Sequence, residues 1–500
     1  MKNRYLPLMA TLALGTAALT AQAQDETDAL RYGQLSPMGT ARSTGFGNAL
    51  GSVGGDFTSL SVNPAGIGVY RTGEMTFTPS IKINSARGTY LGTSATDDAT
   101  RFNINNFGMV FTNAKKGQRY DKAKWKTTSF GIGFNRLADF HRNYAYTGYN
   151  SGASSSSGSE VFVADANNLS LADSAQLGNT NRPAGLGYQS YLINYDGVNN
   201  SFYTVVPYVS GIQQSRNVSE RGRYNEMVLS FGGNYMEKLL LGGTVGIDML
   251  RYRRSSTYTE STDQPNPDNF SSYTMTDELL TKGTGINLKL GFIYKATDQF
   301  RFGAAVHTPT YFSLTDEYST SLRSQVDFYS NSASSDIGLY NYTYSSPWRS
   351  VLSATGIMGK VGFISADVEF VGYNTSRFSF NIEEADYERF INQSIRNSYK
   401  SATNIRVGAE VRPTDILMVR AGFGYYGSPY KNSAVNGDRI DISAGIGFRF
   451  QDWFLDFGLV NSSYKIAEQP YLLPYPEVVV PTATIKHNRN NAALTIGFKF

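Results

Sequence analysis

Residues 439–450 read RIDISAGIGFRF, and the character of their side chains alternates without a break. Every even position holds an apolar residue, and every odd position holds a charged residue, a serine or a glycine. Successive side chains of a β-strand point to opposite faces of the sheet, so this pattern predicts a strand with one apolar face and one polar face. NIRVGAEVR (404–412) and FISADVEF (363–370) repeat the pattern, which favours an all-β chain.

The connections between such stretches alternate as well, between short turns and long polar loops. Short turns lie at 237–238, 296–299, 358–360, 413–415 and 451–452, and long loops lie near 147–223, 256–280, 312–341, 380–398, 428–436 and 466–484. A soluble sandwich gives no reason for all long loops to share one end, whereas an outer-membrane barrel has short periplasmic turns and long outer loops. Counting strands by this rule gives about fourteen, so we predict a transmembrane antiparallel β-barrel.

The polar faces of these strands are rich in charges of both signs. We expect them to line the lumen as a hydrogen-bonded wall, because opposite charges that pair are tolerated away from water. The predicted wall includes Asp367, Glu369, Arg406, Glu410, Arg420, Arg439, Asp441 and Asp456. Six tyrosines near the outer strand ends are expected in an aromatic girdle, with ordinary strand packing as the alternative: Tyr144, Tyr146, Tyr252, Tyr311, Tyr425 and Tyr426.

The two ends of the chain predict export to an outer membrane and assembly there. The stretch MKNRYLPLMATLALGTAALTAQAQ (1–24) has two cations, an apolar run and an A-x-A pattern, so residues 1–23 are expected to be a cleaved signal peptide, with a membrane anchor as the alternative. The last residues, LTIGFKF (494–500), resemble the signal read by the barrel-assembly machinery, because an aromatic residue closes an amphipathic strand. We therefore expect a Gram-negative outer membrane as the location, its lipids as partners, and that machinery as a partner through Phe500.

Motifs for other classes of function are absent from the sequence or incomplete. The formal charge of +4 does not suggest a nucleic-acid partner. No G-x-S-x-G elbow, no full dinucleotide fingerprint and no phosphate-loop lysine occurs, so we expect no enzyme activity, no catalytic residue and no cofactor. The three histidines, His141, His307 and His487, suggest a metal or haem site at the outer rim. Because they are far apart in sequence and no cysteine assists them, solvated rim histidines are expected and no metal site is predicted.

The segment before the first strand has a different character. Residues 29–72 show no sustained alternation and are rich in Gly, Ser and Thr, yet seven apolar side chains are too many for a solvated tail: Phe46, Leu50, Val53, Phe57, Leu60, Val62 and Ile67. We expect this segment to fold back into the lumen as a hatch that plugs the barrel. The chain would then consist of a signal peptide (1–23), a hatch (24–73) and a barrel (74–500). Inward glycines of the Gly-x-Gly pairs would leave space inside that barrel.

Two stretches of the sequence carry a resemblance to a known family. GFGNALGSVGGDFTSLSVNPAGIG (45–68) contains the triplet Asn63-Pro64-Ala65. GINLKLGFIYKATDQFRFGAAVHTPT (285–310) contains a spaced set of residues, Asn287, Gly291, Tyr294, Arg301, Gly303 and Pro309. With these motifs the chain resembles the FadL-type family of outer-membrane transporters for long-chain fatty acids and aromatic hydrocarbons. Thr308 stands where that family has serine, and Ala296 stands where proline is frequent.

The resemblance implies a hatch that blocks a fourteen-stranded barrel, and a ligand that leaves sideways through a gap at an inward kink of the third strand. The third strand here, TTSFGIGFNRLADFHRNYAY (127–146), loses its alternation at Arg136, which suggests a bulge or kink, with a membrane-edge position of Arg136 as the alternative. The predicted ligand-binding and gating residues are Phe46, Phe57, Asn63, Pro64, Ala65, Gly131, Gly133 and Phe134.

These observations predict passive uptake of a hydrophobic small molecule, such as a long-chain fatty acid. A lateral exit suits such a ligand, because each CH₂ group gains about 0.8 kcal/mol by staying out of water. Two alternatives stay open. One is a haem receptor that uses the histidines, and the other is a structural or adhesive surface protein that uses its long Tyr/Ser/Asn loops.

Overall fold

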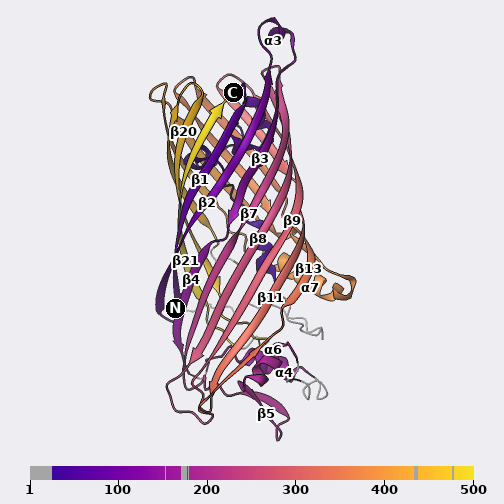
Figure 1. Cartoon of the computed structure of the whole chain (residues 1–500), viewed down its shortest axis with the longest axis vertical. Helices are drawn as coiled ribbons and strands as arrows, with labels where there is room; N and C mark the ends of the chain where they lie inside the picture. The colour runs from indigo at the N-terminus through magenta and orange to yellow at the C-terminus, as the bar shows by residue number, and fades with distance from the viewer. Residues whose placement is uncertain (1–24, 153, 170–176, 178–179, 433–436, 476–477) are drawn as a thin grey trace, which may run out of the picture.

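A computed structural model describes residues 25–152, 154–169, 177, 180–432, 437–475 and 478–500. The predicted signal peptide lies outside these residues. The chain forms an antiparallel sheet that closes on itself, since β1 (Glu74–Tyr90) pairs with both β2 (Thr93–Ala114) and β21 (Ala483–Lys499). The result is the tall barrel of Figure 1.

The wall of the barrel has fourteen strand positions, which confirms the predicted fold class. Three positions are interrupted and consist of two strands each: β3 (Trp125–Asp139) with β4 (Arg142–Asn150), β10 (Phe300–His307) with β11 (Tyr311–Val326), and β13 (Gly338–Ser345) with β14 (Arg349–Met358). The others are β1, β2, β7 (Ile212–Tyr235), β8 (Leu239–Ser261), β9 (Ser272–Lys295), β15 (Gly362–Gly372), β17 (Ser401–Val411), β18 (Leu417–Tyr426), β19 (Arg439–Arg449), β20 (Trp453–Glu468) and β21.

Shorter elements lie inside the barrel and at its ends. The residues before β1 form α1 (Glu26–Gly33), α2 (Ala41–Gly45), η1 (Phe57–Ser61) and η2 (Pro64–Val69). The connections contain α3 (Gln118–Lys122), α4 (Glu160–Asn167), α6 (Pro183–Gln189), β5 (Ile193–Asp196), β6 (Ser201–Thr204), β12 (Tyr329–Ser334), η4 (Tyr373–Thr375), β16 (Arg377–Ser379), η5 (Ile382–Glu384) and α7 (Ala385–Ser398). Within the described residues, no helix combines the length and the apolar character needed to cross a membrane.

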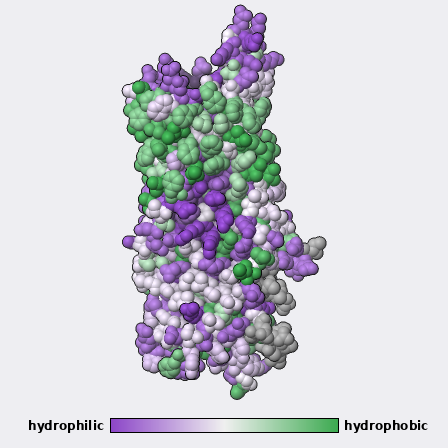
Figure 2. All heavy atoms as spheres, viewed as in Figure 1, coloured by the Kyte–Doolittle hydropathy of each residue, from purple (hydrophilic) through white to green (hydrophobic). Residues whose placement is uncertain are grey.

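An apolar belt surrounds the end of the barrel that carries the short turns. Outward side chains there are large and exposed, for example Ile81, Phe231 and Leu290, and Figure 2 shows them as a green band. A closed barrel pairs its backbone polar groups internally, so it can present such a belt to the hydrocarbon core of a bilayer. The belt therefore marks the part of the wall that spans the membrane.

Beyond the belt the strands continue further than the sequence predicted. Much of the predicted loops 256–280 and 312–341 is strand, because β8 ends at Ser261, β9 begins at Ser272 and β11 reaches Val326. Outside the bilayer the outer face of a strand meets water, so both faces become polar and the alternation in the sequence is lost. The wall is also uneven, since β7 has 24 residues and β18 has 10.

The prediction of an aromatic girdle is wrong for three of the six tyrosines. Tyr144, Tyr146 and Tyr252 are buried on the inner side of the wall, where they pack with other aromatic rings. Tyr311 is 64% exposed on the outer surface. For Tyr144 and Tyr146 alternation could not decide the side, because β3 and β4 lie on either side of a break that the sequence placed only approximately.

The predicted charged wall is confirmed. Arg420 bridges two carboxylates, with Nε 2.6 Å from Glu410 Oε2 and Nη1 2.7 Å from Asp456 Oδ1. Arg349 and Arg406 both face Glu369, at 3.2 and 3.6 Å. Each of these charges has a partner of opposite sign, which compensates the cost of removing it from water.

A cap covers the outer end of the barrel. It is built from α4, α6, β5 and β6, which lie together at the foot of Figure 1. Phe162, Leu186 and Phe202 of this cap belong to one buried cluster with Tyr273 and Leu322 of the wall. The cap is therefore packed onto the outer strands.

Candidate functional site

Short helices with polar caps give the residues before β1 their fold, and we call residues 25–72 the hatch. The Asp56 side chain accepts a hydrogen bond from the Thr58 backbone N–H at 2.9 Å and begins η1. The Asn63 side chain begins η2 in the same way, and Pro64 follows as the first helical residue, where a missing N–H costs nothing. These caps replace the regular pairing that the hatch lacks.

Asn63 is completely buried and binds three backbone groups. Its Nδ2 donates to the carbonyl oxygen of Gly51 at 2.6 Å and to that of Phe292 at 3.1 Å. Its Oδ1 accepts from the Ala65 backbone N–H at 3.1 Å. One side chain thus joins two parts of the hatch to strand β9, whereas the sequence suggested only a turn at Asn63-Pro64.

The two stretches that carried the family resemblance contact each other. A Cβ atom at Gly291 would lie 2.0 Å from Asn63 Oδ1, and one at Gly303 would lie 2.4 Å from the Gly51 carbonyl oxygen. Between them, Arg301 Nη1 donates to the carbonyl oxygen of Val53 at 3.3 Å. The hairpin 285–310 is therefore the surface on which the hatch docks.

The predicted site residues Phe57 and Gly133 meet at this interface. A Cβ atom at Gly133 would lie 2.6 Å from Cζ of Phe57, and one at Gly108 would lie 2.2 Å from its Cε2. Gly131 receives the neighbouring hatch residue Leu60, since a Cβ atom there would be 2.8 Å from Leu60 Cδ1. The inward glycines thus leave space, as expected, and the hatch fills it.

Phe46, Pro64 and Ala65 also lie between the hatch and the wall. The Phe46 ring is fully buried and meets the Phe363 ring edge-on at 5.5 Å. A Cβ atom at Gly242 would lie 2.3 Å from the Pro64 carbonyl oxygen. Ala65 packs in a small apolar cluster with two wall residues, Leu240 and Ile293.

Phe134 does not join this group. It pairs with Phe107 across β2 and β3, and paired residues of an antiparallel sheet share a face. Phe107 is exposed on the belt, so Phe134 also faces outward. The sequence placed Phe134 beside the glycines, but the strand period puts it on the opposite side of the wall.

The third strand is interrupted at the predicted place. The β3 register shifts between Arg136 and Ala138, and β3 ends at Asp139. Pairing between β2 and β3 stops at Asn106 and Asn135, so the outer part of β2 has no partner on that side among the described strands. The hatch uses the freed carbonyls, because the N–H of Ser36 donates to Leu137 at 2.8 Å and that of Met38 donates to Arg136 at 2.7 Å.

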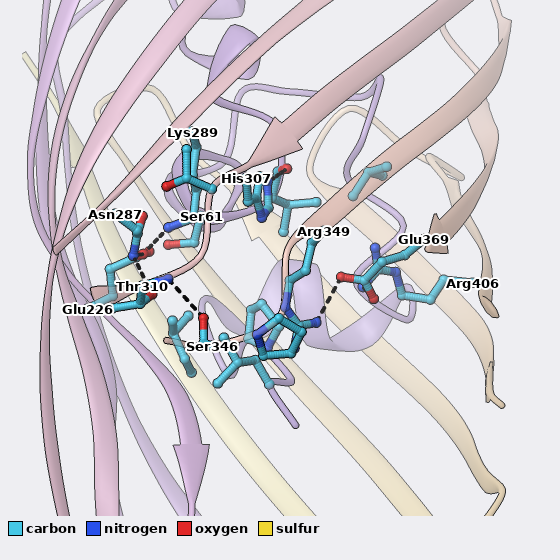
Figure 3. Close-up of a pocket in the computed structure, with 17 residues that line it drawn as sticks. Ser61, Glu226, Asn287, Lys289, His307, Thr310, Ser346, Arg349, Glu369 and Arg406 are labelled. Atoms are coloured by element: carbon cyan, nitrogen blue, oxygen red, sulfur yellow. Dashed lines mark hydrogen bonds and ion pairs between the residues drawn. The ribbon is translucent and has the colours of Figure 1, made fainter. Parts of the chain in front are cut away.

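A small cavity lies between the hatch and the wall, with a free volume of about 40 Å³. One side of it is apolar, with Leu35, Pro37, Val62, Leu137 and Val351. The other side is charged and is shown in Figure 3, with Lys289, His307, Arg349, Glu369 and Arg406. The volume suffices for only a few water molecules, since one water needs roughly 10–15 Å³.

No protein-family model matches the chain, and no curated protein does. Among solved structures, a Pseudomonas aeruginosa FadL homologue is similar over 94% of this chain and 100% of its own, with a TM-score of 0.54 and 12% sequence identity. The chain has the FadL-type fold. The toluene transporters TbuX of Ralstonia pickettii and TodX of Pseudomonas putida are similar at TM-scores of 0.49 and 0.48, with identities of 15% and 12%, over 92% of this chain and 98% of each of theirs. The fourteen-stranded barrel that the sequence resemblance implied is confirmed.

The three histidines of this FadL-type barrel lie apart from one another, and the prediction of solvated rim histidines is wrong for His307 and His487. His307 is buried, and its Nε2 is 2.9 Å from the carbonyl oxygen of Val62 in the hatch. His487 is fully buried between the rings of Tyr464 and Tyr144. In the part of the chain that the structure describes, no three His, Cys, Asp or Glu side chains gather as metal ligands would.

The junction between the hatch and the FadL-type wall is held by one carboxylate in the β7–β8 turn. Glu237 accepts from Arg71 Nη2 at 2.8 Å, from Asn234 at 2.9 Å, from Lys295 at 3.1 Å, and from the Tyr120 hydroxyl. Burial raises the pKa of Glu237, and these hydrogen bonds outweigh burial and lower it to about 2. Arg71 is the residue at which the chain leaves the hatch.

Sequence reasoning missed several residues that build this site in the FadL-type fold. The bonds of Ser36 and Met38 to β3 use backbone N–H groups, which leave no trace in a sequence. Asp367, which accepts from the Gly51 N–H at 3.0 Å, was predicted only as part of the wall. Gly291 and Gly303 offered a usable signal, because a small inward residue opposite a predicted plug indicates contact.

Proposed function

We propose that the protein is an outer-membrane channel for the passive uptake of hydrophobic small molecules, in which the hatch is the gate. The observation that carries this proposal is a FadL-type barrel whose lumen contains a hatch docked on the wall. The solved structures that resemble this chain include a FadL homologue and toluene transporters. The apolar belt supports placement in a bilayer, and the predicted signal peptide supports export to the outer membrane.

The size of the cavity supports hatch gating. About 40 Å³ cannot hold an alkyl chain or an aromatic ring, so a ligand that enters this cavity must displace part of its lining, to which the hatch contributes Leu35, Pro37 and Val62. The lining of the cavity combines an apolar side with a charged side, which suits an amphiphile such as a fatty acid. Ser36 and Met38 of the hatch bond to β3 at its break, and Leu137 also lines the cavity, so displacement of the hatch would connect the cavity with the lipid outside.

The break in β3 supports lateral exit. Among the described residues, the outer part of β2 has an unpaired edge there, and two backbone hydrogen bonds from the hatch cover the end of β3. A hydrophobic ligand that leaves here enters the bilayer directly and avoids water. Such an exit needs no energy-coupling machinery.

A disulfide between hatch and wall tests the gate. The hydroxyl oxygens of Ser52 and Thr355 are 2.7 Å apart, and the native chain contains no cysteine. The double variant Ser52→Cys/Thr355→Cys should form a disulfide, whose sulfur atoms need about 2.05 Å. We expect oxidation to reduce the uptake of oleate into proteoliposomes by about tenfold or more, and a reducing agent to restore it.

A second disulfide serves as the matched control. The hydroxyls of Thr259 in β8 and Thr274 in β9 are 3.0 Å apart and do not contact the hatch. Oxidation of Thr259→Cys/Thr274→Cys should leave uptake unchanged. If the Ser52–Thr355 disulfide also left uptake unchanged, gating by the hatch would be wrong.

A second candidate is an adhesive role for the cap. Tyr191, Tyr195 and Tyr203 are 60%, 43% and 44% exposed around the hairpin of β5 and β6. Removing residues 188–204 should abolish surface adhesion and leave oleate uptake intact if this second role exists. The haem alternative finds no support in the geometry, because the histidines share no site.

A further inference from the structure

A bulge places an additional amide at the level of the β3 break. Thr78 pairs with Asn106 and Pro79 pairs with Ile104, so Asn105 has no partner on β1. Proline has no N–H to donate to the ladder, and a bulge turns a side chain to the other face. As a result Asn105 and Asn106, although adjacent in sequence, are both completely buried.

Three side chains at this level form what we call the donor cluster: Asn103, Asn105 and Arg136. Their acceptor atoms are already used, because Asn103 Oδ1 accepts from Arg136 Nη1 at 2.5 Å and Asn105 Oδ1 accepts from Ser80 Oγ at 2.8 Å. Their remaining donors, Asn103 Nδ2, Asn105 Nδ2 and Arg136 Nε, have no partner among the described residues. Each side chain is more than nine-tenths buried. Because buried N–H donors are normally hydrogen-bonded, the unpaired donors of the cluster indicate a site for a hydrogen-bond acceptor.

The charge around the donor cluster is positive. Lys82 and Arg136 share one carboxylate, Asp139, at 2.6 and 3.2 Å. Arg101 pairs with Lys82 across β1 and β2 and therefore shares its inward face, yet Arg101 is exposed and has no ion pair in the described part of the chain. An exposed residue on an inward face indicates that the wall is open here. On the side where Figure 1 shows β1, β2 and β3, Figure 2 shows a hydrophilic patch next to the apolar belt.

Apolar side chains lie on the other face of the same strand. Phe102, Ile104 and Phe107 of β2 are exposed on the outer surface, in register with the donor cluster. A molecule at the edge of β2 would therefore meet donors and cations on one side and aromatic and aliphatic groups on the other. This combination matches an acidic amphiphile better than a hydrocarbon.

We propose that the donor cluster binds the oxyanion head group of an amphiphile, a carboxylate or a phosphate, whose chain lies along the outer face of β2. This rests on the proposed function in that it names the chemistry of the molecule at the lateral opening. Amide and guanidinium N–H groups bind such oxyanions with charge-assisted hydrogen bonds. The head group would be held at the break while the chain contacts lipid.

Two probes with the same chain and different head groups test the proposal. Full-length protein in nanodiscs is titrated with oleate and with oleyl alcohol, and compared with Asn103→Asp/Asn105→Asp, which replaces two donors by carboxylates of nearly the same shape. We expect oleate binding to weaken by about tenfold or more, and oleyl alcohol binding to change by less than about twofold. Asn105→Leu should weaken oleate binding as well, because it removes a donor without adding charge.

Asn113→Asp is the matched control, because Asn113 is exposed and lies at the other end of the same strand, β2. It should change neither titration. Equal effects of Asn103→Asp/Asn105→Asp on oleate and oleyl alcohol, or no effect on oleate, would overturn the proposal.

Further arms separate the sources of the oxyanion. If native mass spectrometry finds a phospholipid that the double variant loses, and oleate uptake is unchanged, the head group belongs to a membrane lipid. If oleate uptake falls while oleyl alcohol uptake persists, the head group belongs to the transported molecule. Failure of the native protein to take up either probe would contradict the proposed function, even where oleate binding still depends on Asn103 and Asn105.

Discussion

At the scale of single residues, the hatch is held mainly by contacts to backbone atoms. Asn63 binds three backbone groups, and the glycines opposite it let the two backbones approach closely. Such contacts depend on position and shape rather than on side-chain charge. They explain why Asn63 and Gly291 occur in the two motifs that resemble a known family.

Asn63→Ala should loosen the hatch without unfolding the barrel. The substitution removes the hydrogen bonds of Asn63 to two carbonyls and one N–H, so we expect docking to weaken by about 2–4 kcal/mol. Limited proteolysis should then cleave residues 25–72 faster, while the barrel keeps its heat-modifiable mobility on gels. Asn113→Ala, at an exposed position, is the control, and equal protection in both variants would show that Asn63 is only a connector.

Gly291→Ala should have a similar effect for a steric reason. Its Cβ atom would lie 2.0 Å from Asn63 Oδ1, so the hatch or the strand must shift, at a cost of about 1–3 kcal/mol. Gly356→Ala provides the comparison, because its Cβ atom would meet nothing nearer than 3.7 Å. Thermal unfolding should distinguish the two variants, and equal melting temperatures would contradict the close contact.

At the scale of elements, the hatch joins the wall at two ends. At the outer end Ser36 and Met38 bond to the interrupted β3, and at the turn end Glu237 binds Arg71. Between these ends the hatch lies on inward glycines and is hydrogen-bonded to the wall through Asn63, Arg301 and Asp367. The contacts at the two ends differ in chemistry and should respond to different conditions.

The stability that Glu237 contributes at the turn end of the hatch should depend on pH. The pKa of Glu237 is about 2 in the folded protein, below its ordinary value of 4.5, so the stabilisation is present above pH 4.5 and is lost as the pH falls towards 2. The difference in melting temperature between the native protein and Glu237→Gln should shrink over this range. Glu278→Gln, in an exposed ion pair, should differ little from the native protein at any of these pH values, and a Glu237→Gln difference that stays constant down to pH 2 would refute the role of this carboxylate.

The attachment of the hatch to β3 should depend on the backbone N–H of Met38. Met38→Pro removes the N–H that donates to the Arg136 carbonyl at 2.7 Å. We expect the neighbouring Ser36 amide to exchange with solvent about fivefold faster, because a bond worth about 1 kcal/mol is lost from the same segment. Ser36→Ala keeps both N–H groups and is the control. Unchanged exchange in Met38→Pro would mean that the two bonds are independent.

The sequence allowed prediction wherever one face of a strand meets lipid and the other meets the lumen, as in residues 439–450. It also located the interruption at Arg136, because a lost alternation is visible along the chain. It misplaced Tyr144 and Tyr146, because the side on which they fall depends on the exact register beyond that interruption. Phe134 lies before the interruption, and the regular alternation of β3 already puts it on the face opposite Gly131 and Gly133. The backbone contacts of the hatch could not be predicted, since N–H and carbonyl groups are the same in every residue.

At the scale of the whole molecule, the hatch completes a lumen that is lined with paired charges. Without it, groups such as Arg42, which lies 3.0 Å from Glu410, would be missing from the wall network. The remaining charges would face a water-filled channel. The barrel strands would still pair with each other, since the pairing of β1 with β21 does not involve the hatch.

Deletion of residues 25–72 should therefore open a path for small polar solutes. We expect single-channel conductance in planar bilayers to rise well above that of the native protein, because charged side chains favour water and ions in the lumen. A variant with the Ser52–Thr355 disulfide keeps the hatch in place and should stay closed. If the deletion variant did not conduct ions, this result would indicate that the cap also closes the outer end of the barrel.

The contact between the ends of the chain has a consequence for biogenesis. The Ala41 N–H donates to Thr495 Oγ1 at 2.7 Å, and the Phe500 N–H donates to the Gly73 carbonyl at 3.1 Å, so residues more than four hundred positions apart are joined both inside the lumen and at the seam. Contacts of such sequence separation form late, because a long loop must close first. The contact of Ala41 can therefore form only once β21 is in place, so the last step of hatch docking coincides with the closure of the barrel.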